Sequence, residues 1–335
     1  MILSVYLRVA VHLVFVAKYY IKERESCIFK KKNAVREFIM KYAVAIDIGG
    51  TNTRVALVNE NLEITDRQQF ATNPEDPKET LGKIADVIKG YDCEIVGAGM
   101  SCPGPLDLVN EKIITPPNIR GDWYHLPVAQ KLRDMIHIPV YLNNDGNLAA
   151  LAEAVAGEGK NYRFVQFLTV STGIGAGFVI DKKIYQGAHG WANEVENTIM
   201  MQDGPSHGTI LPGGIEAISS GTAITMRARE AGLDVKHAGE INDLALEGNE
   251  VAQKIMTDAK VHLANFIASI YNLVDPDIVI LGGSVAIKIN GFVAEVEELV
   301  KSKVYEAQRP FIKVRKSTLS EDSGLIGAAY LAFSK

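Results

Sequence analysis

The chain has 335 residues, which is long enough for two ordinary domains with a sizeable shared core. Apolar residues make up 47% and charged residues 22% of it, a balance that is typical of soluble globular proteins. The net charge of −5 disfavours a nucleic-acid-binding protein, because such proteins usually carry a basic excess or a basic stripe that neutralises phosphates.

Residues 1–39 differ in pattern from the rest of the chain. Residues 9–20 are an apolar stretch, and a charged run follows over residues 22–32. The stretch is shorter than the roughly 20 apolar residues of a membrane span, and no small-residue cleavage site of a signal peptide follows it. A clean strand pattern begins at Met40. We therefore expect Met40 to be the biological start and residues 1–39 to be a leader outside the fold.

From Met40 onward, strand patterns alternate with helical patterns, as in α/β proteins. The helical pattern is clear where Leu81, Ile84, Ala85 and Ile88 recur at helical spacing. In chain order the pattern predicts a strand pair around a glycine turn over residues 41–58, a helix over 77–90, a strand over 94–100, a helix over 128–135, a strand over 140–143 and a helix over 146–156.

The second half of the chain repeats the opening design. Residues 164–179 contain an apolar strand, a Thr/Ser/Gly turn and a second apolar strand, in the order found at residues 43–58. This repetition favours a duplicated domain, and chance similarity of the two hairpins is the weaker alternative. A helix over 249–273, a strand over 278–281, a helix after Gly282-Gly283 and a terminal helix from Gly324 follow. We predict two α/β domains with a cleft between them: residues 40–157 with 318–335, and residues 158–317.

The three cysteines, Cys27, Cys93 and Cys102, form no CxxC pair. A sparse, odd set argues against a disulfide framework and favours a reducing compartment, so we expect a cytoplasmic protein. Local spacing also builds no cysteine-based zinc site. We expect Cys93 and Cys102 to be small buried side chains.

The sequence DIGGTNTR, from Asp47 to Arg54, lies at the turn of the first strand pair. Glycines allow close approach to an anion, and the amides and hydroxyls of Thr51 and Thr53 can bind phosphate oxygens. Asp47 at the strand end can hold Mg²⁺ directly or through water. A simple tight hairpin is the alternative, but it would not require an acid and two threonines around two glycines. Neither GxGxxG nor GxxxxGK[ST] occurs, which removes the dinucleotide and P-loop interpretations.

This stretch resembles the first phosphate motif of the ROK family of sugar kinases, within the actin-like ATPase superfamily. Other segments resemble that family in the same order: residues 97–107 its strand and loop under the sugar, Pro117-Asn118 with Trp123 its sugar-contacting loop, residues 143–147 its catalytic loop, residues 169–177 its second phosphate loop, and residues 277–285 its adenosine segment. The resemblance covers essentially everything from Met40. It implies the two-domain actin-like, ribonuclease-H-like fold, ATP and Mg²⁺ as cofactors, a small-molecule sugar substrate and a homodimer. From the net charge and the short apolar stretch we expect no nucleic-acid and no membrane partner.

Asp145 is the residue that we expect to act as the general base. Phosphoryl transfer to a sugar needs an acceptor for the hydroxyl proton within hydrogen-bond reach of that oxygen. Asp145 follows a short strand and opens a helix, and the family's catalytic aspartate falls at this position. The alternative is an N-cap aspartate, and both roles can hold together.

The resemblance also assigns the other site residues. Planar Asn, Asp and Glu groups pair well with sugar hydroxyls. Together with Asp145, the residues that the resemblance places on the sugar are Asn118, Asn144, Glu194, Asn197 and Glu216. Those that it places on the nucleotide are Asp47, Gly49, Gly50, Thr51, Asn52, Thr53, Thr172, Gly173, Gly175, Gly282 and Gly283, with Asp47 also on Mg²⁺.

Two segments depart from the family pattern. Asn193-Glu-Val-Glu-Asn197 stands where many members carry Gly-Glu-x-Gly-His, and residues 206–214 contain no cysteine where many members carry a cysteine-rich zinc loop. We therefore expect no zinc, and we expect His207 to be a solvated loop histidine. Because these changes lie near the implied sugar site, the enzyme types of glucokinase, N-acetylmannosamine kinase and glucoside kinase all stay open.

The predicted function is ATP-dependent phosphorylation of a hexose or hexose derivative. An alternative of another class is a sugar-responsive transcriptional regulator of the same family. Such a regulator needs a helix-turn-helix of several dozen residues before the first phosphate motif, and residues 1–39 are short and carry an unpatterned apolar run. A catalytically dead scaffold is disfavoured because Asp47, Asp145 and both glycine loops are present.

Overall fold

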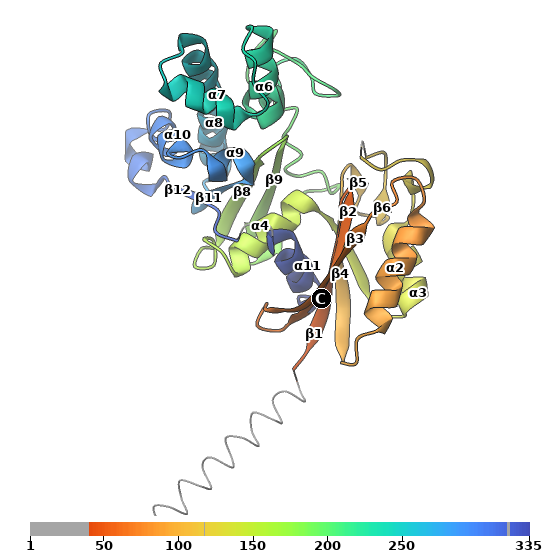
Figure 1. Cartoon of the computed structure of the whole chain (residues 1–335). Coiled ribbons are helices and arrows are strands. Elements are labelled where there is room, and N and C mark those ends of the chain that lie inside the picture. The colour runs from red at the N-terminus through yellow and green to blue at the C-terminus, as the bar shows by residue number, and fades with distance from the viewer. Residues whose placement is uncertain (1–39, 117, 320–321) are drawn as a thin grey trace, which may run out of the picture. The chain divides into compact units, whose positions relative to one another are not determined.

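Two five-stranded sheets organise the described part of the computed structural model, which comprises residues 40–116, 118–319 and 322–335. The predictions for residues 1–39 lie outside these residues. The first sheet has the order β3-β2-β1-β4-β7 and the second has the order β10-β9-β8-β11-β12 (Figure 1). Each sheet therefore takes its strands in the same sequential order, third, second, first, fourth and fifth. The mixed α/β class is confirmed, and the repeated order agrees with the expected duplication.

The first sheet combines antiparallel and parallel pairing. β1 is antiparallel to β2 and parallel to β4, and β4 is parallel to β7. The elements of this half are β1 (Tyr42–Ile48), β2 (Asn52–Asn59), β3 (Ile64–Ala71), α2 (Pro77–Lys89), β4 (Ile95–Cys102), β5 (Leu106–Asp107), β6 (Lys112–Ile113), η1 (Gly121–Trp123), α3 (Val128–Ile136), β7 (Val140–Asn144) and α4 (Asp145–Val155).

The second sheet repeats this pairing, with β8 antiparallel to β9 and parallel to β11. Its elements and the helices around it are β8 (Phe164–Val170), β9 (Ile174–Ile180), β10 (Lys183–Ile184), α5 (Ile215–Ser219), α6 (Gly221–Glu230), α7 (Ala238–Leu246), α8 (Glu250–Val274), β11 (Ile278–Gly282), α9 (Gly283–Lys288), α10 (Phe292–Lys301), η2 (Glu306–Phe311), β12 (Val314–Lys316) and α11 (Ser323–Phe333).

Alternation of side chains along β1 separates two cores. Val44 and Ile46 face the core that holds α2 and α3, whereas Ala43 and Ala45 face the core that holds α4 and α11. The second core also takes in residues of β8, β9 and β11, so α4 and α11 lie between the two sheets. A third core lies under α8 and α10 on the other side of the second sheet.

Small residues allow the two central helices to pack closely. A side chain at Gly327 of α11 would place its Cβ 1.9 Å from the carbonyl oxygen of Leu148 on α4, so only glycine fits there. This contact fixes α4, whose first residue is Asp145, against a helix that also packs on β1 and β4. No helix of the described ranges is long and apolar enough to cross a membrane.

Candidate active site

The carboxyl ends of β1, β4 and β7 meet at one edge of the first sheet. The ends of β1 and β4, together with the start of α4 after β7, line a cavity of about 580 Å³, here called the cleft cavity. Asp47 of β1 lies opposite Ser101 of β4, which in turn lies opposite Asn143 of β7. Neighbours in register point to the same face of a sheet, here the face that carries α4 and α11. Parts of the second sheet, including Thr169 and Gly282, line the same cavity.

Asp145 is the first residue of α4 and lines the cleft cavity. Its Oδ1 accepts a hydrogen bond from the backbone N–H of Gly146 at 2.8 Å. The N-cap alternative for Asp145 is wrong, because the extended residue before it, Asn144, caps the helix by accepting from the N–H of Asn147 at 2.7 Å. The Asp145 carboxylate is therefore not used as the cap and faces the cavity.

The surroundings of Asp145 make its carboxylate more basic. The residue is open to the cleft, but the protein walls around it remove much of its hydration, and this desolvation is the largest cause that raises the pKa of Asp145 above its ordinary value. The hydrogen bond from Gly146 opposes the shift, and the negative charge of Asp47 adds to it. A base of raised pKa is suited to taking a proton from an alcohol.

Asp47 is paired with Arg54 across the first hairpin. The β1–β2 register sets these residues opposite each other, and Asp47 Oδ2 accepts from Arg54 Nη2 at 2.5 Å and from Arg54 Nε at 3.1 Å. Both side chains line the cleft cavity. Sequence reasoning assigned no role to Arg54, although the hairpin register was a signal that could have placed it beside Asp47.

The first glycine turn lies against the loop that holds Asn118. A Cβ at Gly50 would lie 2.6 Å from the Cβ of Asn118, so the glycine allows this close contact, and Gly49, Gly50 and Asn118 all line the cleft cavity. The structure does not bring Thr53 there. Its side chain is buried, and its hydroxyl shares a 2.8 Å hydrogen bond with the hydroxyl of Thr72. The exposed Thr51 and Asn52 are also outside the described lining of this cavity.

The second glycine turn is held by Glu216. Glu216 Oε2 accepts from the backbone N–H of Ile174 at 2.8 Å, and a Cβ at Gly173 would lie 2.5 Å from that oxygen. Gly175 pairs with Thr169 within the β8–β9 ladder. The predicted sugar ligand Glu216 thus contacts the turn after β8. Gly282, the last residue of β11, and Gly283, the first residue of α9, line the cleft cavity.

The loop after β10 reaches the end of the first sheet through one hydrogen bond. Asn144 Nδ2 donates to Glu194 Oε1 at 2.8 Å. Desolvation is the main cause that raises the pKa of Glu194, and the charges of Glu196 and Asp145 add to it. Asn197 is not part of this contact, because its Oδ1 accepts from the N–H of Leu211 at 2.7 Å and closes the loop on itself.

The same loop contains the segment where zinc ligands would be expected in the family. His207, which was predicted to be a solvated loop histidine, is partly exposed, but its Nε2 is shielded from solvent and has no hydrogen-bond partner within the described structure. Among the residues that the structure describes, no cluster of three or more His, Cys, Asp or Glu side chains could hold a metal ion.

The cleft cavity nevertheless fits a magnesium ion that arrives with phosphates. Mg²⁺ is usually held by one or two carboxylates together with substrate phosphates and water, and Asp47 supplies such a carboxylate at the cavity wall. The hydroxyl of Ser101 is buried at the same wall and has no partner in the described chain, so it is available to a water molecule or a ligand.

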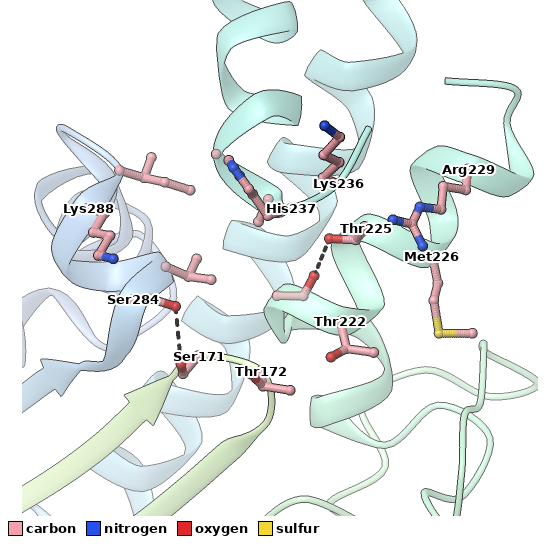
Figure 2. Close-up of a pocket in the computed structure, with 15 residues that line it drawn as sticks. Ser171, Thr172, Thr222, Thr225, Met226, Arg229, Lys236, His237, Ser284 and Lys288 are labelled. Carbon is pink, nitrogen blue, oxygen red and sulfur yellow. Dashed lines mark hydrogen bonds between the residues drawn. The ribbon is translucent and has the colours of Figure 1, made fainter. Parts of the chain in front are cut away.

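A second cavity of about 540 Å³, here called the outer cavity, lies among α6, α7 and α9 (Figure 2). Ser171 and Ser284 both line it, and their hydroxyl oxygens share a 3.1 Å hydrogen bond. The polar residues that line it are Ser171, Thr172, Thr222, Thr225, Arg229, Lys236, His237, Ser284 and Lys288. Gly283 lines the cleft cavity and the next residue, Ser284, lines the outer cavity, so one loop borders both. Sequence reasoning assigned to the nucleotide the two segments that contribute Ser171, Thr172, Ser284 and Val285, but it missed the lining from α6 and α7, which carry no phosphate or sugar motif.

Comparisons with known proteins found similar sequences and structures. The sequence model of the ROK family matches residues 43–335. The N-acetylmannosamine kinase of Yersinia pestis is 30% identical over 295 residues, which is 88% of this chain and 99% of that protein. The structure of a ROK hexokinase from Thermus thermophilus superposes with a TM-score of 0.80 at 28% identity, over 88% of this chain and 99% of that one. The structure of a ROK glucokinase from Streptomyces griseus in complex with glucose and AMPPNP gives a TM-score of 0.65 at 26% identity, over 88% and 100%.

Proposed function

The chain belongs to the ROK family, and on that premise we propose that it is an ATP-dependent kinase that phosphorylates a hydroxyl group of a hexose or hexose derivative. One observation carries the assignment of the site: the Asp145 carboxylate, with its raised pKa, faces a cavity that is bordered by the first glycine turn and by Gly282 and Gly283. This arrangement supplies a base at the place where a phosphate chain can lie beside a sugar.

The nucleotide would span the two cavities. The outer cavity has the size of a small-ligand site and would take the nucleoside. The phosphates would pass the backbone of Gly282 and Gly283 into the cleft cavity, where Gly49 and Gly50 allow the first hairpin to approach them. Mg²⁺ bound with these phosphates supplies positive charge to the transferring group, and Asp47 is the residue that would hold it, directly or through water.

Asp145 would act on the sugar hydroxyl. It accepts the hydroxyl proton while that oxygen, the 6-hydroxyl of a hexose in our proposal, forms the bond to the γ-phosphorus of ATP. The bond from this phosphorus to the β,γ-bridging oxygen breaks, and ADP leaves. The products are a sugar phosphate, ADP and one proton, which Asp145 later releases to solvent.

For the sugar we propose Asn118, Asn144 and Glu194 as hydrogen-bonding partners. Asn144 and Glu194 already contact each other, and Asn118 lines the cleft cavity. The contacts of Asn197 and Glu216 favour a different role, because each accepts a backbone hydrogen bond that shapes a loop next to the site. The similarity to the Yersinia pestis enzyme makes N-acetylmannosamine the first sugar to test.

A coupled assay of ADP release tests the proposed function. Glucose, mannose, fructose, N-acetylglucosamine, N-acetylmannosamine and a β-glucoside are offered with ATP and Mg²⁺. We expect at least one sugar to stimulate ADP release. The proposal fails if no sugar does so. In that case, DNA binding by the chain that changes when sugar is added, measured in a gel-shift experiment, would favour the transcriptional regulator.

We further propose that the enzyme is a cytoplasmic homodimer without zinc. Light scattering of the purified chain tests the dimer, and fractionation of cells that express it tests the compartment. Metal analysis of the purified protein tests the zinc, because a stoichiometric amount would contradict the proposal.

A further inference from the structure

One hydroxyl on the wall of the cleft cavity lacks a hydrogen-bond partner. Ser101, next to the last residue of β4, is 1% exposed and lines this cavity, but its hydroxyl makes no hydrogen bond within the described chain. Ser317, a second serine of the same lining, differs because its hydroxyl donates to Glu153 Oε1 at 2.5 Å. Buried hydroxyls are normally satisfied, so an open one beside a cavity indicates a partner that arrives through the cavity.

Ser101 lies between the two carboxylates of the site. In the sheet register it is opposite Asp47 of β1 on one side and opposite Asn143 of β7 on the other. Asp145 follows Asn143 by two residues and lines the same cavity. The charges of both aspartates also reach Cys102, the neighbour of Ser101, where they add to burial, the main cause that raises the pKa of its thiol. A ligand that reaches Asp145 from the cavity therefore also comes close to Ser101.

The charges on both sides of Ser101 favour an uncharged partner that can donate as well as accept. Ionised Asp47 and Asp145 only accept hydrogen bonds, and they repel an anion that has no cation with it. A sugar hydroxyl has one proton to donate and two lone pairs. During phosphoryl transfer its proton goes to the base and one lone pair attacks the phosphorus, which leaves the second lone pair free for a fixed donor.

We propose that the Ser101 hydroxyl donates a hydrogen bond to the reacting hydroxyl of the sugar and so positions that oxygen for attack. Asp145 holds the proton of the sugar hydroxyl and Ser101 holds one of its lone pairs, so the other lone pair points at the γ-phosphorus. Only the sugar proton moves, to Asp145, and Ser101 keeps its own. The inference rests on the proposed kinase function and adds a substrate contact to it.

A thermodynamic cycle between protein and sugar isolates this contact. The probes are the sugar that the ADP-release assay identifies, with N-acetylmannosamine tried first, and its deoxy analogue without the reacting hydroxyl, which is the 6-deoxy sugar in our proposal. In calorimetric titrations of the full chain, Ser101→Ala should weaken binding of the parent sugar by about threefold to tenfold, the range for a lost neutral hydrogen bond. Binding of the deoxy analogue should not change, because it never makes the contact.

The matched control is Ser269→Ala. The Ser269 hydroxyl donates to the carbonyl of Asn265 at 2.9 Å at an exposed position of α8, outside the lining of both cavities. This variant should bind both sugars like the wild type. With ATP and Mg²⁺, Ser101→Ala should also lower kcat/KM for the parent sugar by at least the factor found in binding, whereas the control should not.

Three outcomes would overturn the inference. Equal losses with the parent and the deoxy sugar would mean that Ser101 shapes the site without touching the reacting hydroxyl. Wild-type binding of the parent sugar by Ser101→Ala would mean that no contact exists. Weaker binding of ATP, titrated in EDTA, at unchanged sugar affinity would make Ser101 a phosphate contact instead.

The test does not depend on one variant. Because Ser101 makes no hydrogen bond within the described chain, we expect Ser101→Ala to fold, which circular dichroism checks. Should it fail to fold, Ser101→Cys, whose thiol is only a weak donor, decides by the same cycle. A wild-type chain that binds no sugar and phosphorylates none would instead refute the proposed function itself.

Discussion

At the scale of single residues, Asp145 combines two opposed properties. It must be ionised to accept a proton, whereas its desolvation and the nearby charge of Asp47 favour the protonated form. A carboxylate held in this way is a stronger base than a fully hydrated one, and it also costs folding stability once it is charged. Both consequences can be measured.

Asp145→Asn should abolish turnover, leave sugar binding largely intact and raise the melting temperature at neutral pH. The folded pKa of Asp145 lies above its unfolded value, so the stability linked to this group is complete below the unfolded pKa and is lost as the pH rises through the folded pKa. Asparagine does not titrate and can still accept the Gly146 hydrogen bond. Calorimetry at several pH values compares the melting temperatures of the variant and the wild type. We expect the gain in melting temperature to shrink as the pH falls toward about 4. Retained activity in the variant would contradict the role of Asp145 as the base.

The pH profile of kcat/KM should report the same group. Activity requires the ionised base, so the rate should rise with pH through a pKa above the ordinary aspartate value of about 4. Asp47→Asn removes one of the charges that raise this pKa. Its profile should therefore shift to lower pH, even though its maximal rate falls. If the acidic limb of the wild-type pH profile instead has the ordinary aspartate pKa, a group other than Asp145 limits the rate.

At the scale of elements, α4 carries the catalytic residue at one end and a buried carboxylate near the other. Glu153 is fully buried and accepts hydrogen bonds from Ser317 Oγ at 2.5 Å and from the N–H of Glu158 at 3.1 Å. These partners lie in the segments after α4 and after β12, which carry the chain between the two sheets. Lys182 also holds the first segment, because its ammonium group donates to the carbonyl of Lys160 at 2.8 Å and to three other carbonyls. The position of α4 relative to both sheets therefore depends on buried polar contacts as well as on the apolar core.

Glu153→Gln should lower the free energy of unfolding by about 1–3 kcal/mol. The amide that replaces the Glu153 carboxylate keeps one acceptor oxygen, but its NH₂ group would face one of the two donors, Ser317 Oγ or the N–H of Glu158, that the carboxylate accepts from. Urea denaturation measures the change. Glu79→Gln, at an exposed position of α2, is the control and should stay within about 0.5 kcal/mol of the wild type. Equal stabilities of the two variants would show that the Glu153 contacts contribute little.

At the scale of the whole molecule, the cleft cavity is lined by residues of both sheets, so ligands that bind there hold the two sheets together. The preferred sugar and a non-hydrolysable ATP analogue with Mg²⁺ should each raise the melting temperature. Each adds about 2.7 kcal/mol when it is present at a hundred times its dissociation constant. We expect the two together to raise the temperature by more than the sum of the separate shifts, because each ligand favours the arrangement that the other needs. Thermal shifts that merely add would show independent sites.

Much of the fold was predictable because its segments carry a local pattern. The helical spacing of Leu81, Ile84 and Ile88 predicted α2 within one residue at its end, and the apolar runs predicted β1, β4 and β11. β3 carries a weaker signal, because it is an edge strand whose side chains are mostly partly or fully exposed, which leaves little apolar alternation. The helices α6 and α7 were missed because each buries few apolar side chains.

By itself the sequence predicted the repeated strand–turn–strand design, the glycine turns and Asp145 and Asp47 as candidate site residues, because these predictions rest on residues that are close along the chain. Only the tertiary structure decided that Arg54 lies on Asp47, that the Ser101 hydroxyl is buried at the cleft and that Thr53 is turned away to Thr72. The outer cavity also appeared only there, since α6, α7 and α9 form it from separate parts of the sequence. The physical reason is that hydrogen bonds and cavities depend on which strands pair and which helices pack, and local periodicity carries no information on those long-range contacts.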